Sequence, residues 1–263
     1  MHLIFQPAEE GLGGGAAMIA DGLFDRFPCD AIFGMHNWPG LGVGKFQLRT
    51  GPMWAGAARF DIIVNGRGAH GARPESGIDP VITASHIAIA LQTVVSRNVR
   101  PVDAAVLSLT QLHAGEAYNV IPERAVIRGT ARCFSREMMA LLEHNMRRIA
   151  AGVAGAFGAT ATLDFRTGYP PLANNADEAA FVADVAAELV GEENVDRDGE
   201  LAMVSEDFSL MLEQRPGAYI QIGNSDTPGT CGLHHPGYDF NDAILPIGAS
   251  LFARLAEKKL ARG

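Results

Sequence analysis

The pattern of apolar and polar positions predicts an α/β protein. Short apolar runs punctuated by turn residues alternate with stretches of helical periodicity. In the first part of the chain we expect strands over 2–5, 30–35 and 43–48 and a short helix over 16–23, and we interpret 2–5 as a buried strand. The same alternation returns after residue 169. There we expect helices over 177–190, 206–213 and 244–260 and a strand over 218–222.

The middle of the chain has a different pattern, which predicts a second domain. Phe60, Ile62 and Val64 alternate with Arg59, Asp61 and Ile63, which predicts a strand. Further strands are expected over 105–112, 125–134 and 160–165. Asp79-Pro80 and Ser135 are helix-start signals, each followed by an apolar helical stripe. The resulting order, β-α-β-β-α-β, is the ferredoxin-like unit. We therefore expect a domain over 55–168 inserted into a larger one formed by 1–54 and 169–263.

Composition and charge exclude several classes of partner. The 263 residues are 48% hydrophobic and carry a formal net charge of −9, which argues against non-specific binding to nucleic acid or to an anionic membrane. No apolar run reaches the roughly 20 residues of a membrane span, and we see no secretory signal. The three cysteines have no CxxC pairing, which favours free thiols in a reducing compartment. We expect a cytoplasmic protein.

Three polar sites, at strand ends or in a loop, have the chemistry of metal ligands. Glu9 and Glu10 follow the first apolar run, His36 closes the second, and His234 lies in a turn-rich loop. The carboxyl ends of strands are where open α/β sheets place their sites. A carboxylate with two imidazoles suits Zn²⁺ or Mn²⁺. Taken singly, each has a plain alternative: a solvated acidic turn, a hydrogen-bonded strand end, an exposed loop.

The expected inserted domain has its own polar candidates. His70 lies in a glycine-rich turn where it could polarise a carbonyl, or it could be a hydrogen-bonded loop histidine. Asn119 could be an amide donor or a turn residue, and Arg132 lies on a strand face where pairing with an acid is usual. Ser205-Glu-Asp-Phe208 has the pattern of a helix start with acids in its first turn.

Six motifs in this order resemble one enzyme family. They are Phe5-Gln-Pro-Ala-Glu-Glu-Gly11, Gly34-Met-His-Asn37, Gly66-x-Gly-x-His70, Asn119-Val-Ile-Pro122, Ser205-Glu-Asp-Phe208 and Leu233-His-x-Pro236. The combination resembles the metal-dependent amidohydrolases related to aminoacylase and the glutamate carboxypeptidases. The nearest subgroup is that of the hippurate hydrolases, N-acetyl amino-acid deacetylases and auxin-conjugate hydrolases. The resemblance covers essentially the whole chain.

The resemblance implies a role for each candidate in the first and last parts of the chain. Glu9 matches the general base that takes a proton from the attacking water. Glu10, His36 and His234 match metal ligands. The cofactor implied is Zn²⁺ or Mn²⁺, with Co²⁺ or Ni²⁺ as alternatives and two ions per site in the complete enzyme. The substrate implied is a small N-acyl amino acid.

The middle domain matches a lid and dimerisation domain on a zinc-exopeptidase-like fold. His70 matches a histidine that supports the oxyanion in the partner subunit's site, so the resemblance implies a homodimer. Asn119 and Arg132 match positions that hold the substrate, with Arg132 suited to its carboxylate.

One departure from the family leaves alternatives open. The family carries a further N-terminal segment with a Gly-Cys-Gly-His-Asp-like motif that supplies a cysteine and a histidine to the metals, and this sequence has no such motif. We therefore expect a catalytic domain incomplete at its N-terminus. The alternatives are a non-catalytic dimerising or ligand-binding remnant, and a hydrolase with one metal held by Glu10, His36 and His234 alone.

Overall fold

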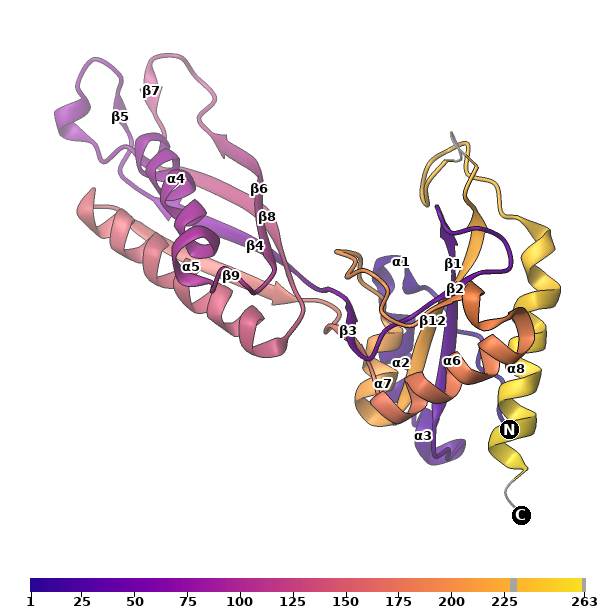
Figure 1. The fold of residues 1–263 in the computed structure, drawn as a ribbon. Helices are drawn as coiled ribbons and strands as arrows, with labels where there is room; N and C mark the ends of the chain where they lie inside the picture. Colours follow the sequence, from indigo (N-terminus) through magenta and orange to yellow (C-terminus); the bar gives the residue numbers. More distant parts are fainter. Residues whose placement is uncertain (228–230, 262–263) are drawn as a thin grey trace. The chain divides into compact units, whose positions relative to one another are not determined.

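A four-stranded antiparallel sheet organises the middle of the chain in the computed structural model, which describes residues 1–227 and 231–261 (Figure 1). Its strands are β4 (Gly56–Asn65), β6 (Ala105–Ala114), β8 (Arg124–Cys133) and β9 (Thr160–Thr167). They lie in the order β6-β8-β4-β9. Counted along the chain this is second, third, first, fourth, which is the ferredoxin-like order that the sequence pattern predicts.

Two long helices cover one face of this sheet. They are α4 (Pro80–Asn98) and α5 (Arg136–Ala156). Each begins where the sequence predicts, because the Asp79 carboxylate accepts from the Val81 amide (2.8 Å) and the Ser135 hydroxyl from the Met138 amide (3.0 Å). Their apolar stripes and alternate residues of β4 and β8 form one buried core. Its fully buried members include Phe60, Ile62, Ile87, Leu91, Ile127, Leu142 and Met146.

A separate two-stranded antiparallel sheet is formed in the same part of the chain. Strand β5 (Ala69–His70) pairs antiparallel with β7 (Val120–Ile121), placing His70 opposite Val120, and the short 3-10 helix η1 (Pro74–Ser76) follows β5. The sequence pattern does not predict this pair, since two-residue strands have no measurable alternation.

The chain forms two compact units. One comprises residues 1–54, 172–202 and 206–263, and the other residues 55–171 and 203–205. The first is built on a mixed sheet in the order β1-β12-β2-β11, in which β1 runs parallel to β12. The bounds are β1 Ile32–Pro39, β2 Phe46–Gln47, β11 Val195–Asp196 and β12 Gly217–Ser225. A separate antiparallel pair joins β3 (Gly51–Trp54) to β10 (Leu172–Asn174).

Helices pack on both faces of the mixed sheet. On one face lie α6 (Ala176–Val190) and α8 (Leu245–Leu260), and on the other α2 (Gly14–Ala20), α3 (Leu23–Arg26) and α7 (Phe208–Gln214). Strand β12 contributes to both faces. Ala218 and Ile220 belong to the core with α6 and α8, and Tyr219 belongs to the core with α2, α3 and α7. The remaining short elements are α1 (Glu9–Leu12), η2 (Glu192–Asn194) and η3 (Asp242–Ile244).

Some predicted elements differ from those observed. The buried strand expected over 2–5 is wrong: these residues form no strand, and the side chains of Leu3 and Phe5 are 72% and 86% exposed. An apolar run forms a strand only where a neighbouring strand pairs with it. Among the described residues β1 pairs with β12 alone, so residues 2–5 do not add a strand to the other edge of β1. Strand β1 also continues past His36 to Pro39, and the helix expected from Glu206 begins at Phe208.

The cysteines and helices bear on two further expectations. Cys29, Cys133 and Cys231 are all free thiols, as their spacing predicts. Within the described part of the chain, no helix combines the length and the apolar character that crossing a membrane requires.

Candidate active site

The segment that carries Glu9 and Glu10 has an irregular backbone. Helix α1 is a single turn with no buried side chain, and Gly11 inside it has φ +94°. Ala8, directly before it, adopts the left-handed conformation (φ 51°). Among the described residues, His234 is the only other non-glycine with positive φ (65°). Such strain costs free energy and concentrates at functional sites, so both strained positions mark the region of the predicted ligands.

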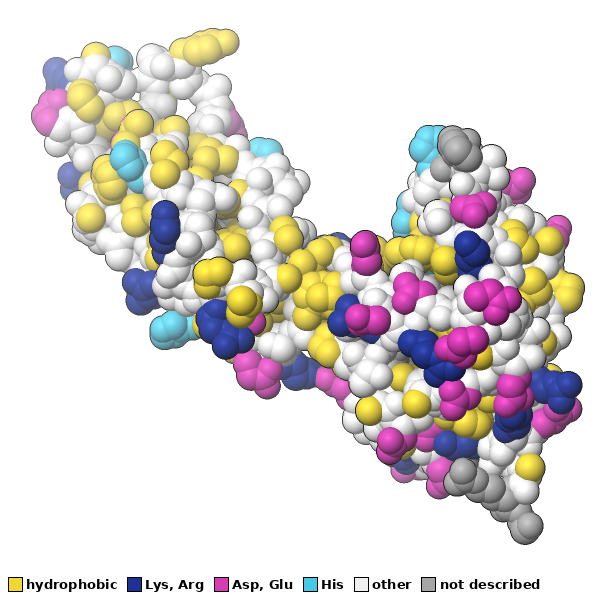
Figure 2. Space-filling model, in the orientation of Figure 1, with side chains coloured by type: hydrophobic (Ala, Val, Ile, Leu, Met, Phe, Trp, Pro, Cys, Tyr) yellow, Lys and Arg dark blue, Asp and Glu magenta, His cyan; other side chains and the backbone are white. Residues whose placement is uncertain are grey.

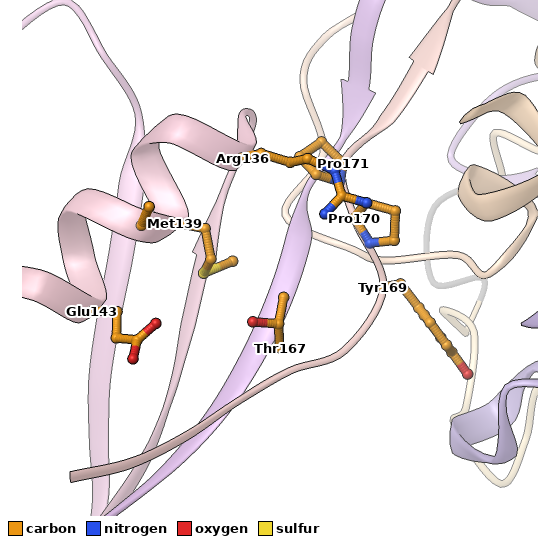
Figure 3. A pocket seen from close by; sticks show the side chains of 8 residues that line it. Arg136, Met139, Glu143, Thr167, Tyr169, Pro170 and Pro171 are labelled. Carbon is orange, nitrogen blue, oxygen red and sulfur yellow. The ribbon is translucent and has the colours of Figure 1, made fainter. Parts of the chain in front are cut away.

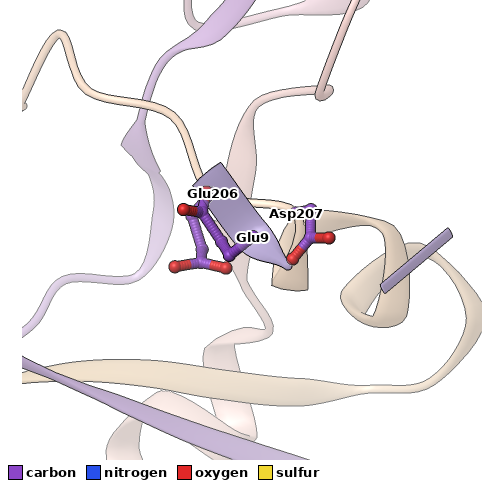
Figure 4. A group of neighbouring side chains, drawn as sticks. All are labelled: Glu9, Glu206 and Asp207. Atoms are coloured by element: carbon purple, nitrogen blue, oxygen red, sulfur yellow. The ribbon is translucent and has the colours of Figure 1, made fainter. Parts of the chain in front are cut away.

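The Glu9 carboxylate lies among other acids. Glu9, Glu206 and Asp207 each offer an oxygen within 4.8 Å of those of the other two (Figure 4). Burial raises the pKa of Glu9 to about 7, with further contributions from the negative charges of Glu206, Glu10 and Asp207. A carboxyl group with this pKa is partly ionised at neutral pH, as a general base requires.

Glu206 and Asp207 are buried carboxylates with a full set of donors. Glu206 is 4% and Asp207 0% exposed. Glu206 accepts from the Phe208 amide (3.0 Å), the Tyr219 hydroxyl (2.9 Å) and the Gln6 side-chain amide (2.6 Å). Burial and the Glu206 charge hold the pKa of Tyr219 well above its usual value, so the hydroxyl keeps its proton and donates it.

Asp207 completes this network. It accepts from Gln6 and, at 2.6 Å, from the buried Gly15 amide. The sequence pattern places these two acids in the first turn of a helix, and the structure corrects that interpretation. They precede α7, and no side chain caps its first turn. Acids in a helix's first turn and buried acids just before a helix have the same local sequence. Only the membership of Ser205–Phe208 in the family motif set could therefore have singled out Glu206 and Asp207.

Two of the three predicted metal ligands meet. The Glu10 Oε1 and His234 Nε2 atoms are 3.5 Å apart, and both side chains are largely exposed, at 76% and 71%. Among the described residues, Glu10, His36 and His234 do not form a three-ligand group within the distance that groups Glu9 with Glu206 and Asp207. The structure therefore brings Glu10 to His234 and leaves His36 outside this pair.

The hydrogen bonds of the histidines define which ring nitrogen is available. His36 Nδ1 lies 2.7 Å from the Asn37 carbonyl oxygen, which only accepts, so Nδ1 carries the proton and Nε2 keeps its lone pair. His235 is the opposite case. Its Nδ1 accepts from the Gly237 amide (3.0 Å), so in the neutral ring the proton is on Nε2. This favours His234 over His235 as the ligand of the pair.

The loop that carries His234 is tied to the sheet by side-chain amides. The Asn37 amide, at the end of β1 beside His36, donates to the Tyr238 hydroxyl. Asn224, 1% exposed on β12, donates to the Asp239 carbonyl (3.3 Å) and accepts from the Asn241 amide (2.9 Å). These bonds attach the residue 231–241 region to the same sheet that carries His36.

His70 and Asn119 are neighbours in the second unit. The Gly71 amide donates to the Asn119 carbonyl (2.7 Å), which joins the segments that carry β5 and β7. The Ala72 amide donates to His70 Nδ1 (3.1 Å), so the neutral ring carries its proton on Nε2. An exposed N–H of this kind is a donor suited to an oxyanion.

Arg132 has an unusual environment. It lies in β8, and its Nη1 atom is buried with no hydrogen-bond partner among the described residues. A guanidinium nitrogen left without an acceptor is suited to an anionic ligand. The ion pair with a local acid, which would be the usual reason for an arginine on a strand face, is not among the described contacts of Arg132.

A hollow elsewhere in the second unit contains none of these candidates. It encloses about 140 Å³ and lies where α5, the end of β9 and the Pro170-Pro171 segment meet (Figure 3). Its lining includes Arg136, Glu143 and Tyr169.

Charge divides unequally between the two units. The unit with Glu9 has 9 Lys and Arg against 21 Asp and Glu, a formal net charge of −12, whereas the unit with Arg132 has 12 against 9, or +3. Figure 2 shows acidic side chains spread over the visible face of the first unit. A negative potential raises the local concentration of cations, so the first unit is the one suited to a divalent metal.

The fold and these residues define an α/β domain with a carboxylate-imidazole site, and comparison with known proteins identifies its family. Residues 1–258 match peptidase family M20/M25/M40, and the chain belongs to this family. It is 41% identical to hippurate hydrolase of Campylobacter jejuni over 99% of this chain and 67% of that protein. It is 37% identical to N-acetyl-L-cysteine deacetylase of Bacillus subtilis, over 99% of this chain and 60% of that protein.

A solved structure shows the same fold. The YXEP protein of Bacillus subtilis, described as a dinuclear metal-binding peptidase of the M20 family, superposes with a TM-score of 0.82 at 32% identity. The match covers 98% of this chain and 64% of that one. The α/β class and the family resemblance predicted from the motifs are thereby confirmed. The chain spans about 60 to 67% of the length of these three relatives.

Proposed function

We propose that this protein takes part in metal-dependent hydrolysis of the amide bond of N-acyl amino acids, with Glu9 as general base. The observation that carries the proposal is the environment of Glu9 in a member of this family. Its carboxyl group is half-buried beside three other carboxylates, with a pKa raised to about 7, next to a glutamate that contacts a histidine. Two relatives named hippurate hydrolase and N-acetyl-L-cysteine deacetylase support the substrate class.

The donor chemistry of Glu10, His36 and His234 fits a divalent metal. Glu10 offers a carboxylate oxygen beside the His234 ring, and His36 offers Nε2 because its Nδ1 proton is held by a carbonyl. A carboxylate with two imidazoles suits Zn²⁺ or Mn²⁺. When bound, such an ion supplies Lewis acidity that lowers the pKa of a coordinated water toward about 7.

The protein's own residues would handle the proton. With a pKa near 7, Glu9 can take a proton from the attacking water and return it to the amine that leaves. In this reaction one water adds across the C–N bond, which breaks to give a carboxylic acid and an amine. The two neighbouring buried carboxylates favour the protonated form of Glu9 once it has accepted the proton.

The second unit would supply the groups that recognise the substrate. We assign His70 Nε2 as a donor to the oxyanion in the partner subunit's site, Asn119 as an amide that helps hold the substrate and Arg132 as the partner of the substrate carboxylate. The hydrogen bond that His70 Nδ1 accepts, which leaves the ring proton of the neutral tautomer on Nε2, and the unpartnered Arg132 Nη1 support these assignments. A homodimer formed through this unit and a cytoplasmic location, which three free thiols favour, are parts of the same proposal.

Hydrolysis assays with matched variants test the proposal. The purified protein, dialysed with Mn²⁺ or Zn²⁺, is incubated with hippurate and N-acetylcysteine, and released amine is measured. Glu9→Gln is expected to retain metal and to lower kcat by about 10²- to 10⁴-fold. His234→Ala is expected to weaken metal binding, while the adjacent His235→Ala serves as control. Absence of turnover in a protein that holds metal, or full activity of Glu9→Gln, would contradict the proposal.

A further inference from the structure

We propose that Glu206 and Asp207 are positioning residues that hold the segment carrying Glu9 and Glu10 by clamping both of its ends. This inference rests on the proposed function for its catalytic meaning, although the clamp itself is a property of the fold.

The segment between Pro7 and Gly14 has no core of its own. Helix α1 within it buries no side chain, and the backbone reverses through left-handed conformations at Ala8, Gly11 and Gly13. A single helical turn is unstable without tertiary contacts. The position of Glu9 and Glu10 must therefore be maintained from outside the segment.

The two ends of the segment reach the same pair of buried carboxylates. At the N-terminal end, the Gln6 side-chain amide donates to both Glu206 and Asp207. At the C-terminal end, the Gly15 amide donates to Asp207 at 2.6 Å. Hydrogen bonds to an ionised acceptor are about twice as strong as neutral ones. Eight residues, 7–14, are thus closed into a loop by one dipeptide nearly 200 positions later.

Two glycines make this close approach sterically feasible. A Cβ atom on Gly15 would lie 3.0 Å from the Asp207 carboxylate, and one on Gly14 would lie 1.7 Å from the Pro7 carbonyl oxygen. The second distance is impossible for any other residue without moving the backbone. The glycine cluster is therefore required by the clamp and is not a flexible linker.

Glu206 is itself held in place by the central sheet. Glu206 accepts from the Tyr219 hydroxyl, and the Tyr219 ring packs against Phe208 (5.1 Å between centroids) and Trp54 (5.3 Å). Tyr219 belongs to β12, the strand beside β1. The clamp thus connects the Glu9 segment to the central strands, on which His36 is also placed.

The test compares two clamp variants with a matched control. Asp207→Asn keeps the size of the side chain but replaces an acceptor by a donor, so one of the bonds from Gln6 and Gly15 is lost. Gln6→Ala removes both bonds at the N-terminal end and leaves the buried acids in place. Glu178→Gln is the control, because Glu178 is a 9% exposed carboxylate of the same unit that binds Lys259 at 2.6 Å and contacts no part of the segment.

The first readout needs no activity. Backbone NMR is expected to show lower order parameters for residues 8–14 in both clamp variants, and amide exchange of Gly15 at least about tenfold faster in Asp207→Asn. Glu178→Gln should leave both unchanged. The second readout is Mn²⁺ affinity by titration, which should fall about tenfold in the clamp variants and stay constant in the control.

The outcomes separate this inference from the proposed function. If residues 8–14 keep their order in Gln6→Ala and Asp207→Asn, the clamp is refuted whatever the activity. If Asp207→Asn does not fold, Gln6→Ala alone decides. If the segment loosens in both variants but the wild-type protein neither binds Mn²⁺ nor hydrolyses N-acyl amino acids, the clamp is upheld and the proposed function fails.

Discussion

Replacing Glu9 by Gln should make the metal-free protein more stable above pH 7, although it removes the proposed base. The pKa of Glu9 in the folded protein is about 7, against 4.5 for an unperturbed glutamate. A folded-state pKa raised in this way contributes stability that is fully present below pH 4.5 and lost as the pH rises through 7. Glutamine mimics the protonated form at every pH, so the variant does not incur this loss.

The magnitude follows from the same two values. Each pKa unit corresponds to about 1.4 kcal/mol, so the full difference would be worth about 3 kcal/mol. Glu9 is only half-buried, and solvent screening reduces this to about 1 to 2 kcal/mol. The difference in unfolding free energy between Glu9→Gln and wild type should therefore be near zero at pH 4.5 and grow to about 1 to 2 kcal/mol by pH 8.

Tryptophan fluorescence offers a selective assay. Both tryptophans, Trp38 and Trp54, belong to the unit that contains Glu9, so urea unfolding followed by their emission reports on that unit. The measurement uses a chelator, since a bound cation would lower the pKa of Glu9. Glu257→Gln, which changes a largely exposed carboxylate on α8, is the control and should show no such trend. A difference between Glu9→Gln and wild type that is constant from pH 4.5 to 8 would refute the reasoning.

Three further predictions concern the second unit. Leu142→Ala, in a fully buried position of α5, should lower the free energy of unfolding by about 2 to 5 kcal/mol in a denaturant titration, whereas Ile89→Ala at a 70% exposed position should change it by less than about 0.5 kcal/mol. Asp79→Ala should lower the free energy of unfolding by about 1 kcal/mol in the same denaturant titration, because it removes the cap of α4. Asp79→Asn should keep most of this stability, since asparagine also caps helices, and equal losses in the two variants would argue against the cap. Cys133, whose pKa is raised by burial, should react with a thiol reagent only after unfolding, and mass mapping that finds it labelled in the native protein at pH 8 would contradict this.

The second unit was largely predictable from local sequence. The four strands of its main sheet and its two long helices follow from alternation, from helical stripes and from two capping residues, Asp79 and Ser135, whose bonds the structure contains. These signals act over a few residues, so they can be recognised without knowing the tertiary structure. The run at residues 2–5 shows the limit of such signals. Its apolar character predicts burial, but a strand requires a partner, and local sequence does not supply one.

The candidate site was predictable in chemistry and only partly in arrangement. The residue types of Glu9, Glu10, His36 and His234 indicate a metal-hydrolase site, and their motifs identify the family. The roles of Glu206 and Asp207 were not predictable, because an acidic helix start and a pair of buried acceptors have the same local sequence. Their burial and bonding depend on Gln6 and Gly15, which lie about 200 residues away.

The sequence by itself determined the family, the kinds of ligand and the helices and strands with strong periodicity, because these depend on residue type and local spacing. The tertiary structure alone decided which carboxylates surround Glu9 and which loop brings His234 to Glu10. Each of these is set by contacts between segments distant in the chain, and the pKa of Glu9 depends on burial and on charges that only the folded chain brings together.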